Sequence, residues 1–361
     1  MRTVARGGRE LHRPALNGKA ASMTPAFVSF AGPVLTPEEA ALFRAGNPAG
    51  YILFARNIVD AQQLLRLTDS LRALAGRDDL AILIDQEGGR VARLAPPHWP
   101  GFPPASSFDR LYSLAPISAI AAVEANALAI ALTLHSVGIT VDCWPVLDVR
   151  TPGSYTMIAD RSFGDEPLRV AALGRAALKG LHAGGVVGVV KHMPGKGRAV
   201  VDSHFALPRV EASAAELESD LAPFRALKAA PMGMTAHIVY SAWDDARPAT
   251  QSPIVIADVI RGRIGFDGLL MSDAIEMEAL SGSVAERAAA SLAAGCDVAL
   301  HCTGVLAETA AMIDHIGSDM DLRSRDRLSR AMHMRNATPD VSQLADALIR
   351  RDALLGLTEN A

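Results

Sequence analysis

The 361-residue chain has little cysteine: it contains only Cys143, Cys296 and Cys302, and no two of them form a CxxC pair. Disulfide frameworks and cysteine-held zinc sites use paired or regularly spaced cysteines. An odd number without such spacing favours buried thiols in a reducing compartment. The sequence therefore predicts neither a disulfide framework nor a cysteine-held zinc site.

Long apolar runs and an excess of charge of one sign are also lacking. In the sequence we find no apolar run that approaches the roughly 20 residues a membrane-spanning helix needs. The formal net charge of −4 gives no electrostatic reason to expect nucleic acid or an anionic membrane as a partner. We therefore expect no nucleic-acid or membrane partner, and a monomer or weak homo-oligomer in the cytoplasm.

The first 22 residues are rich in arginine and lack the apolar core of a secretory signal. Met23 directly precedes the first strand-like run. Residues 1–22 are therefore expected to be a disordered extension or to precede the true start of translation. Because residues 23–361 contain no repeat, linker or low-complexity segment, we expect them to form one domain with additional helices after Asp319.

Eight short apolar runs rich in β-branched residues predict strands. Most are continuously apolar rather than alternating, as expected for parallel strands buried on both faces. The runs cover residues 26–32, 50–55, 81–87, 139–145, 186–192, 232–238, 268–274 and 296–301.

Helical patterns separate these runs. Thr36 and Glu39 have the spacing of a capping box, with Pro37 at the first helical position. Further helices are expected over residues 60–75, 116–137, 167–183, 212–229, 252–263, 283–294 and 305–316. Eight strands alternating with helices predict a single-domain (β/α)8 barrel of the TIM type. The rival is an open doubly wound sheet, but no GxGxxG or GxxxxGK[ST] motif follows a strand.

Polar side chains stand at the ends of several predicted strands. Asp85, Lys191, His192, His237 and Asp273 each follow an apolar run. In a TIM-type barrel such positions face the active site, and each group would be costly to bury without a partner. The sequence therefore predicts that these five residues line one pocket.

The residues of that pocket are compatible with several kinds of chemistry. Asp273 could attack an anomeric carbon, and Asp202 beside His204 is a pairing used for proton transfer. Lys191 could instead form a Schiff base, and a non-catalytic sugar-binding barrel is a third reading. No set of histidines has metal-ligand spacing, so no metal or cofactor is expected. Glu276 and Glu278 are expected to lie in the first turn of a helix.

Six sequence runs follow one another along the chain. They are GYILFARNI (50–58), LIDQEGGRVARL (83–94), DRSFG (160–164), KHMPGKG…DSH (191–204), MTAHIVY (234–240) and GFDGLLMSDAIEMEA (265–279). Together these runs resemble bacterial β-N-acetylhexosaminidases of glycoside hydrolase family 3, in the family's order, between about residue 24 and residue 300.

This resemblance implies a retaining enzyme that hydrolyses a terminal, non-reducing, β-linked N-acetylglucosamine through a covalent glycosyl-aspartate. It assigns the nucleophile to Asp273 and the general acid/base to His204, assisted by Asp202. It assigns substrate hydroxyl contacts to five side chains: Asp85, Arg93, Arg161, Lys191 and His192. It also implies muropeptide fragments as substrates, in cell-wall recycling. Phosphorylase and β-glucosidase activities, which occur in the same family, stay open.

The chain departs from the family pattern at a few places in these runs. The usual KHFPGHG appears with Met193 and Lys196, and the usual SDDLSM appears as SDAIEM, which replaces an acid with Ala274. Both changes leave the expected catalytic residues in place. We expect them to affect loop dynamics or specificity.

Overall fold

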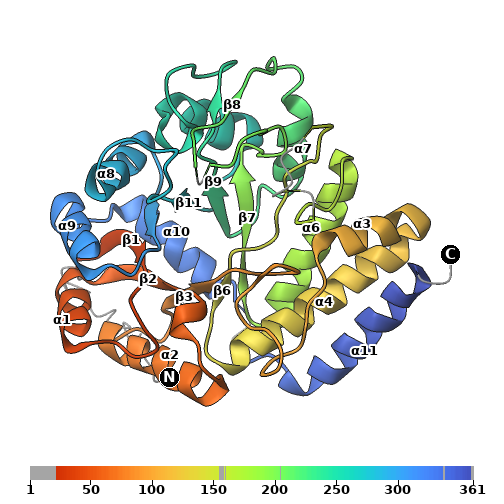
Figure 1. Ribbon diagram of the computed structural model, residues 1–361, viewed down its shortest axis with the longest axis horizontal. Coiled ribbons are helices and arrows are strands. Elements are labelled where there is room, and N and C mark those ends of the chain that lie inside the picture. The colour runs from red at the N-terminus through yellow and green to blue at the C-terminus, as the bar shows by residue number, and fades with distance from the viewer. Residues whose placement is uncertain (1–21, 154–157, 159, 204, 336–337, 359–361) are drawn as a thin grey trace, which may run out of the picture.

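The computed structural model describes residues 22–153, 158, 160–203, 205–335 and 338–358. Eight parallel strands close into a barrel surrounded by helices (Figure 1), which confirms the predicted fold. Each strand overlaps its predicted run. In order round the barrel they are β1 (Thr24–Val28), β2 (Pro48–Leu53), β3 (Ala81–Ile84), β6 (Val141–Asp142), β7 (Val187–Met193), β9 (Met232–Thr235), β11 (Leu269–Ala274) and β12 (Val298–His301), which pairs with β1.

The strands are continuously apolar because both of their faces are buried. Phe27 and Leu83 belong to the apolar cluster inside the barrel. Their neighbours Val28 and Ile84 belong to the larger apolar layer between the barrel and its helices. Successive residues of a strand therefore both meet apolar surroundings, as in other parallel barrels.

The helices form the outer layer of the molecule (Figure 1). Thr36 begins the first helix with the predicted capping box: its hydroxyl accepts the Glu39 N–H at 3.1 Å, and the Glu39 carboxylate accepts the Thr36 N–H at 2.8 Å. The α-helices are α1 (Pro37–Gly46), α2 (Ala61–Ala75), α3 (Ala105–Leu114), α4 (Pro116–Ser136), α6 (Pro167–Ala183), α7 (Glu218–Ala226), α8 (Val284–Ala294), α9 (Leu306–Ile316), α10 (Leu322–His333) and α11 (Leu344–Leu355).

Three details of the predicted helices differ in the structure. Helix α7 begins six residues late, because Ser213 and Glu216 hydrogen-bond each other and close a separate turn before it. The segment after Ser252 widens into a π-type helix, η3 (Val255–Ile264). Helix α3 was not predicted, since no side chain caps its start and no capping signal marks it in the sequence.

Helix α4 corrects the expectation about apolar runs. It is 21 residues long, and an 18-residue window within it has a mean hydropathy of 1.8, so it passes a simple test for a membrane span. However, 67 % of that window is buried inside the protein. Helices α6 and α11 pack along α4 (Figure 1), which accounts for its apolar composition without a membrane.

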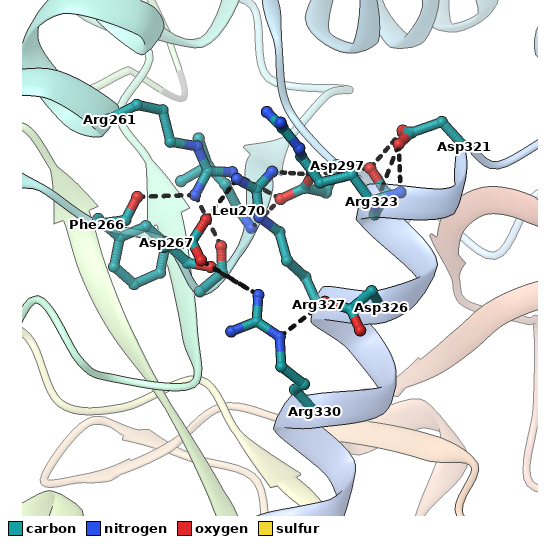
Figure 2. Close-up of polar contacts among 12 residues, drawn as sticks. Arg261, Phe266, Asp267, Leu270, Asp297, Asp321, Arg323, Asp326, Arg327 and Arg330 are labelled. Atoms are coloured by element: carbon teal, nitrogen blue, oxygen red, sulfur yellow. Dashed lines mark hydrogen bonds and ion pairs between the residues drawn. The ribbon is translucent and has the colours of Figure 1, made fainter.

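Helix α10 is fastened to the barrel by a network of charged side chains (Figure 2). Asp297, directly before β12, accepts hydrogen bonds from Arg261 at 2.7 Å and from Arg327 of α10 at 2.9 Å. Its two oxygens also accept bonds from the Leu270 backbone N–H and the Ser324 hydroxyl, both at 2.8 Å. This network lies at the amino ends of β11 and β12. Asp297 directly precedes β12, and Asp267, which accepts from Arg327 at 2.7 Å, lies two residues before β11.

Candidate active site

A cavity of about 520 Å³ lies at the carboxyl ends of the strands. This is the end of the barrel where TIM-type enzymes place their active sites. Its volume falls within the range of small-molecule sites. Six of the predicted site residues line it: Asp85, Arg93, Arg161, Lys191, His192 and Asp273.

One wall of the cavity carries a chain of alternating charges. The Lys191 ammonium donates to Asp85 at 3.0 Å and forms an ion pair with Glu87 at 2.7 Å. Arg161 donates two hydrogen bonds of 2.7 Å to the two oxygens of Glu87. Arg93 completes the chain by donating to the second oxygen of Asp85 at 3.1 Å.

A tight hairpin after β3 brings Arg93 back over Asp85. Strand β4 (Gln86–Gly88) pairs antiparallel with β5 (Val91–Ala92), so the chain reverses within a few residues. Gly88 has φ 93°, and a Cβ there would lie 2.4 Å from the Pro103 carbonyl oxygen. Glycine is therefore required at this turn both by conformation and by close packing.

The charged wall holds its members in their ionised forms. Burial alone would raise the pKa of Asp85 and of Glu87, but the neighbouring cations outweigh it and lower both pKa values. For Lys191, burial would lower the pKa, yet Glu87 and Asp85 raise it above its ordinary value. The Lys191 amine is consequently a protonated hydrogen-bond donor rather than a nucleophile.

His192 is oriented by a carboxylate that the sequence did not single out. Its Nδ1 lies 2.8 Å from Asp148, which also accepts the backbone N–H of His192 at 3.2 Å and of Lys196 at 2.7 Å. Burial lowers the pKa of His192 despite Asp148, so the ring is neutral near pH 7. Because ionised Asp148 only accepts, Nδ1 carries the proton and leaves Nε2 as an acceptor.

Asp273 stands near the end of β11 as an ionised acid. Burial would raise its pKa, but the Lys196 ammonium and the backbone N–H of Ala274 lower it, and any proton on His192 or His237 would lower it further. That N–H donates to the carboxylate at 2.9 Å. A buried carboxylate that stays charged at neutral pH and borders a cavity is suited to nucleophilic attack.

The structure does not bring His237 into the wall of the cavity with the other predicted residues. Its side chain is fully buried, with Nδ1 2.8 Å from the Thr250 hydroxyl and Nε2 2.9 Å from the Ala274 carbonyl oxygen. Since a carbonyl only accepts, Nε2 carries the proton. His237 thus hydrogen-bonds the backbone of the residue after Asp273 instead of lining the cavity.

The loop that carries the predicted acid/base is described only in part. His204 lies outside the described residues. Asp202 and Ser203 are buried, and the Lys196 ammonium donates to the Ser203 hydroxyl at 2.9 Å. A Cβ at Gly197 would lie 1.7 Å from the Val149 carbonyl oxygen, so this glycine serves close packing.

Two further observations bear on the chemistry. Among the described residues, no group of three or more His, Cys, Asp or Glu could hold a metal ion. A second cavity, of about 320 Å³, lies between α6 and α7 beside β7, and its lining contains no acidic side chain. The ionisable strand-end side chains described above therefore gather at the larger of these two cavities.

Comparison with known proteins decides the family. The Glycosyl hydrolase family 3 N terminal domain matches residues 27–326. The chain belongs to this family. It is a glycoside hydrolase, as the sequence resemblance implied.

Relatives in family 3 match over most of their length. The chain is 36% identical to a β-hexosaminidase of Chromobacterium violaceum, over 92% of this chain and 96% of that protein. It is also 36% identical to a β-hexosaminidase of Methylococcus capsulatus, over 91% and 94%. NagZ from Neisseria gonorrhoeae, solved in complex with N-trifluoroacetyl-D-glucosamine, superposes with a TM-score of 0.83 at 31% identity, covering 93% of this chain and 98% of that one.

Four residues of the site were missed by sequence reasoning as functional positions. Glu87 follows Asp85 by two residues, and Asp148 follows the fourth strand, so both carried a strand-end signal. Lys196 lines the cavity and was noted only as a departure from the family pattern. Glu276 also lines it, whereas we expected it in a helix that in fact begins only at Val284.

Proposed function

We propose that this protein is a retaining β-N-acetylhexosaminidase that removes a terminal, non-reducing, β-linked N-acetylglucosamine. One observation carries the proposal: the carboxylate of Asp273 borders a cavity that is also lined by charged hydrogen-bonding groups. The β-hexosaminidase relatives and the likeness to NagZ in complex with N-trifluoroacetyl-D-glucosamine support the choice of sugar.

The reaction takes two steps. In the first, an Asp273 oxygen bonds to C1, the glycosidic C–O bond breaks, and His204 gives its proton to the leaving oxygen. In the second, His204 takes a proton from water, the water oxygen bonds to C1, and Asp273 leaves as a carboxylate. Two inversions at C1 retain its configuration. Asp202 orients and polarises His204.

The charged wall holds the sugar for this reaction. Lys191, Arg93 and Arg161 have N–H groups that donate to hydroxyl or acetamido oxygens. Asp85 and the Nε2 atom of His192 accept from hydroxyl groups. Each of these side chains is already fixed by an ion pair or hydrogen bond, so little side-chain entropy is lost when the sugar binds.

A Schiff-base lyase is not supported by this geometry. Such an enzyme needs an uncharged amine, whereas the two carboxylates beside Lys191 raise its pKa above the ordinary value. For the biological substrate we propose muropeptide fragments of peptidoglycan, cleaved in the cytoplasm during cell-wall recycling. This part of the proposal rests on the sequence resemblance.

The proposal is tested with 4-nitrophenyl N-acetyl-β-glucosaminide and the matching β-glucoside, each with and without phosphate. We expect cleavage of the first substrate, much slower cleavage of the second, and N-acetylglucosamine as product in both buffers. A sugar 1-phosphate as the main product would indicate a phosphorylase instead. A slow fluorinated substrate should leave a covalent sugar on Asp273, found by peptide mass spectrometry; label on Lys191 after borohydride would refute the mechanism.

A further inference from the structure

Glu276 is a carboxylic acid in the cavity that the proposed mechanism does not use. It lies in the turn after β11, three residues beyond Asp273, and lines the same cavity. It stands in the SDAIEM run, where the usual pattern SDDLSM has serine. The acid that this chain lacks at Ala274 is therefore matched by an additional acid two positions later.

The carboxylate of Glu276 is held in place from one side. Its Oε2 accepts the backbone N–H of Cys302, directly after β12, at 3.2 Å. Burial raises the pKa of Glu276, hydrogen bonds from its own backbone N–H and from Cys302 oppose this, and Asp273 raises it further. A carboxylate can accept about four hydrogen bonds, so Glu276 keeps acceptor capacity beside these bonds.

The surroundings of Glu276 are largely apolar. Phe54, Leu300 and Cys302 line the cavity with it. Arg56, the nearby cation, donates instead to the Cys302 carbonyl oxygen and the Ser29 hydroxyl, both at 2.6 Å, and its guanidinium lies 4.8 Å from the centre of the Phe54 ring. Glu276 therefore adds a hydrogen-bond acceptor to a part of the wall that otherwise offers apolar side chains and arginine donors.

The position of Asp273 indicates which part of a bound sugar lies near Glu276. If Asp273 attacks C1, residues next to it in the cavity face the substituents nearest to C1. The hydroxyl-binding groups of β3 and β7 occupy other parts of the wall. The acetamido group on C2 combines an N–H donor, a carbonyl oxygen and a methyl group, so it suits an acceptor set among apolar side chains. Arg93, whose guanidinium lies 5.4 Å from the centre of the Phe54 ring, is a donor for the carbonyl oxygen.

We propose that Glu276 is a specificity-determining residue that accepts the N–H of the 2-acetamido group while the acetamido methyl packs against Phe54. The inference rests on the proposed function and goes further, since it assigns the preference for N-acetyl sugars to a particular side chain.

The first test is the isosteric variant Glu276→Gln. Glutamine has a single acceptor oxygen, which the Cys302 N–H occupies, so an NH₂ group would face the N–H of the substrate. We expect kcat/KM for 4-nitrophenyl N-acetyl-β-glucosaminide to fall about 10-fold or more, as for loss of one buried hydrogen bond. The value for the β-glucoside should stay within about 2-fold. Asp326→Asn, at an exposed acid of α10 outside the cavity, is the control and should leave both values unchanged.

The second test needs no variant. A 4-nitrophenyl β-glucoside with an acetate ester at O2 keeps the carbonyl and the methyl but has no N–H. The unmodified enzyme should cleave it about 10-fold more slowly than the N-acetyl substrate, and Glu276→Gln should remove most of that difference. Equal losses of Glu276→Gln on the N-acetyl substrate and the glucoside, or no discrimination against the ester, would overturn the inference. If the unmodified enzyme cleaves neither the N-acetyl substrate nor the glucoside, the proposed function itself fails.

Discussion

The barrel buries a cluster of charges at each end, and the two clusters differ in how completely they are satisfied. At the amino ends, Asp297 accepts two hydrogen bonds at each of its oxygens, and its side chain is 4% exposed. At the carboxyl ends, Asp85 accepts one bond at each oxygen, and its side chain is 17% exposed. A carboxylate can accept about four hydrogen bonds. Asp297 is therefore saturated by its own chain, whereas Asp85 has unused acceptor capacity facing a cavity.

Unused hydrogen-bonding capacity distinguishes the candidate binding site from the structural cluster, although the two contain the same types of residue. Both clusters contain arginine paired with aspartate or glutamate, and each has a buried acid, Asp297 in one and Glu87 in the other. The amino-end cluster fastens α10 to the barrel (Figure 2), and the protein's own groups satisfy Asp297. The carboxyl-end cluster borders about 520 Å³ of space that a sugar would fill. Substitutions should accordingly affect stability at one end and turnover at the other.

The largest effect is expected at the cavity end, from Asp273→Asn. The amide cannot form the glycosyl ester, so kcat should fall roughly 10⁴-fold or more, as for loss of other catalytic nucleophiles. Substrate binding should largely survive, because the charged wall is unchanged. Stopped assays on 4-nitrophenyl N-acetyl-β-glucosaminide and calorimetric binding of N-acetylglucosamine measure the two quantities. Turnover above one-hundredth of the unmodified rate would remove Asp273 from the nucleophile's role.

The next effect concerns the acid/base assigned to His204. Positioned proton transfer typically contributes about 10²–10⁴-fold. His204→Ala should cost that much on substrates with poor leaving groups and less on 4-nitrophenyl glycosides, whose leaving group needs little protonation. Asp202→Ala should give a milder form of the same pattern. Rates measured over a series of aryl glycosides test this, and equal losses across the series would exclude His204 as the acid.

At the amino end, Asp297→Asn should act on stability. Arg261 and Arg327 would then be buried around a neutral amide, and breaking a buried pair costs about 3–5 kcal/mol of unfolding free energy. Below the melting temperature, kcat and KM should be unchanged. Asp326→Asn is the control, since its exposed pair with Arg330 is worth about 0.5 kcal/mol or less. Urea unfolding with parallel assays checks both; a lowered kcat with unaltered stability would break the comparison between the two ends.

The fold was predictable because its signals are local and repeated. Eight apolar runs, several of them ended by a polar residue, specify the strands, and the capping box at Thr36 specifies the start of a helix. Asp85, Lys191, His192 and Asp273 meet in one cavity because strand ends converge in a closed barrel. The length of α7 was not predictable from apolar pattern alone, since a side-chain pair before it ends the helical run.

The missed site residues share a physical cause. Asp148 and Glu87 act on other side chains, and nothing local shows that His192 or Arg161 folds back onto them. His237 ends a strand like the other predicted residues, yet Thr250 and the Ala274 carbonyl hold it beneath the cavity wall. Whether a strand-end side chain points into the cavity or away from it depends on hydrogen-bond partners that are distant in sequence. The sequence alone does not specify those partners.

The smallest effect is the loss of stability with acid, to which the cavity end should contribute most. Asp85, Glu87 and Asp273 have folded-state pKa values below their ordinary values, so their stabilisation is present above about pH 4 and is lost as the pH falls through the folded-state pKa. His192 and His237 have lowered pKa values, so the unfolded chain gains protons below about pH 6.5 and the folded protein does not.

Asp142 should act in the opposite direction, because burial raises its pKa and the folded state then binds the proton first. The groups that favour unfolding in acid outnumber it, and one unit of pKa shift is worth about 1.4 kcal/mol. We therefore expect the unfolding free energy, measured in urea at pH 7, 6, 5, 4 and 3, to fall steadily by a few kcal/mol. The histidines should account for the fall above about pH 4; Asp85→Asn should give a shallower fall below about pH 4, whereas Asp326→Asn at the other end should reproduce the unmodified curve. A stability that rises from pH 7 to pH 4 would mean that Asp142 outweighs the charged wall and both histidines.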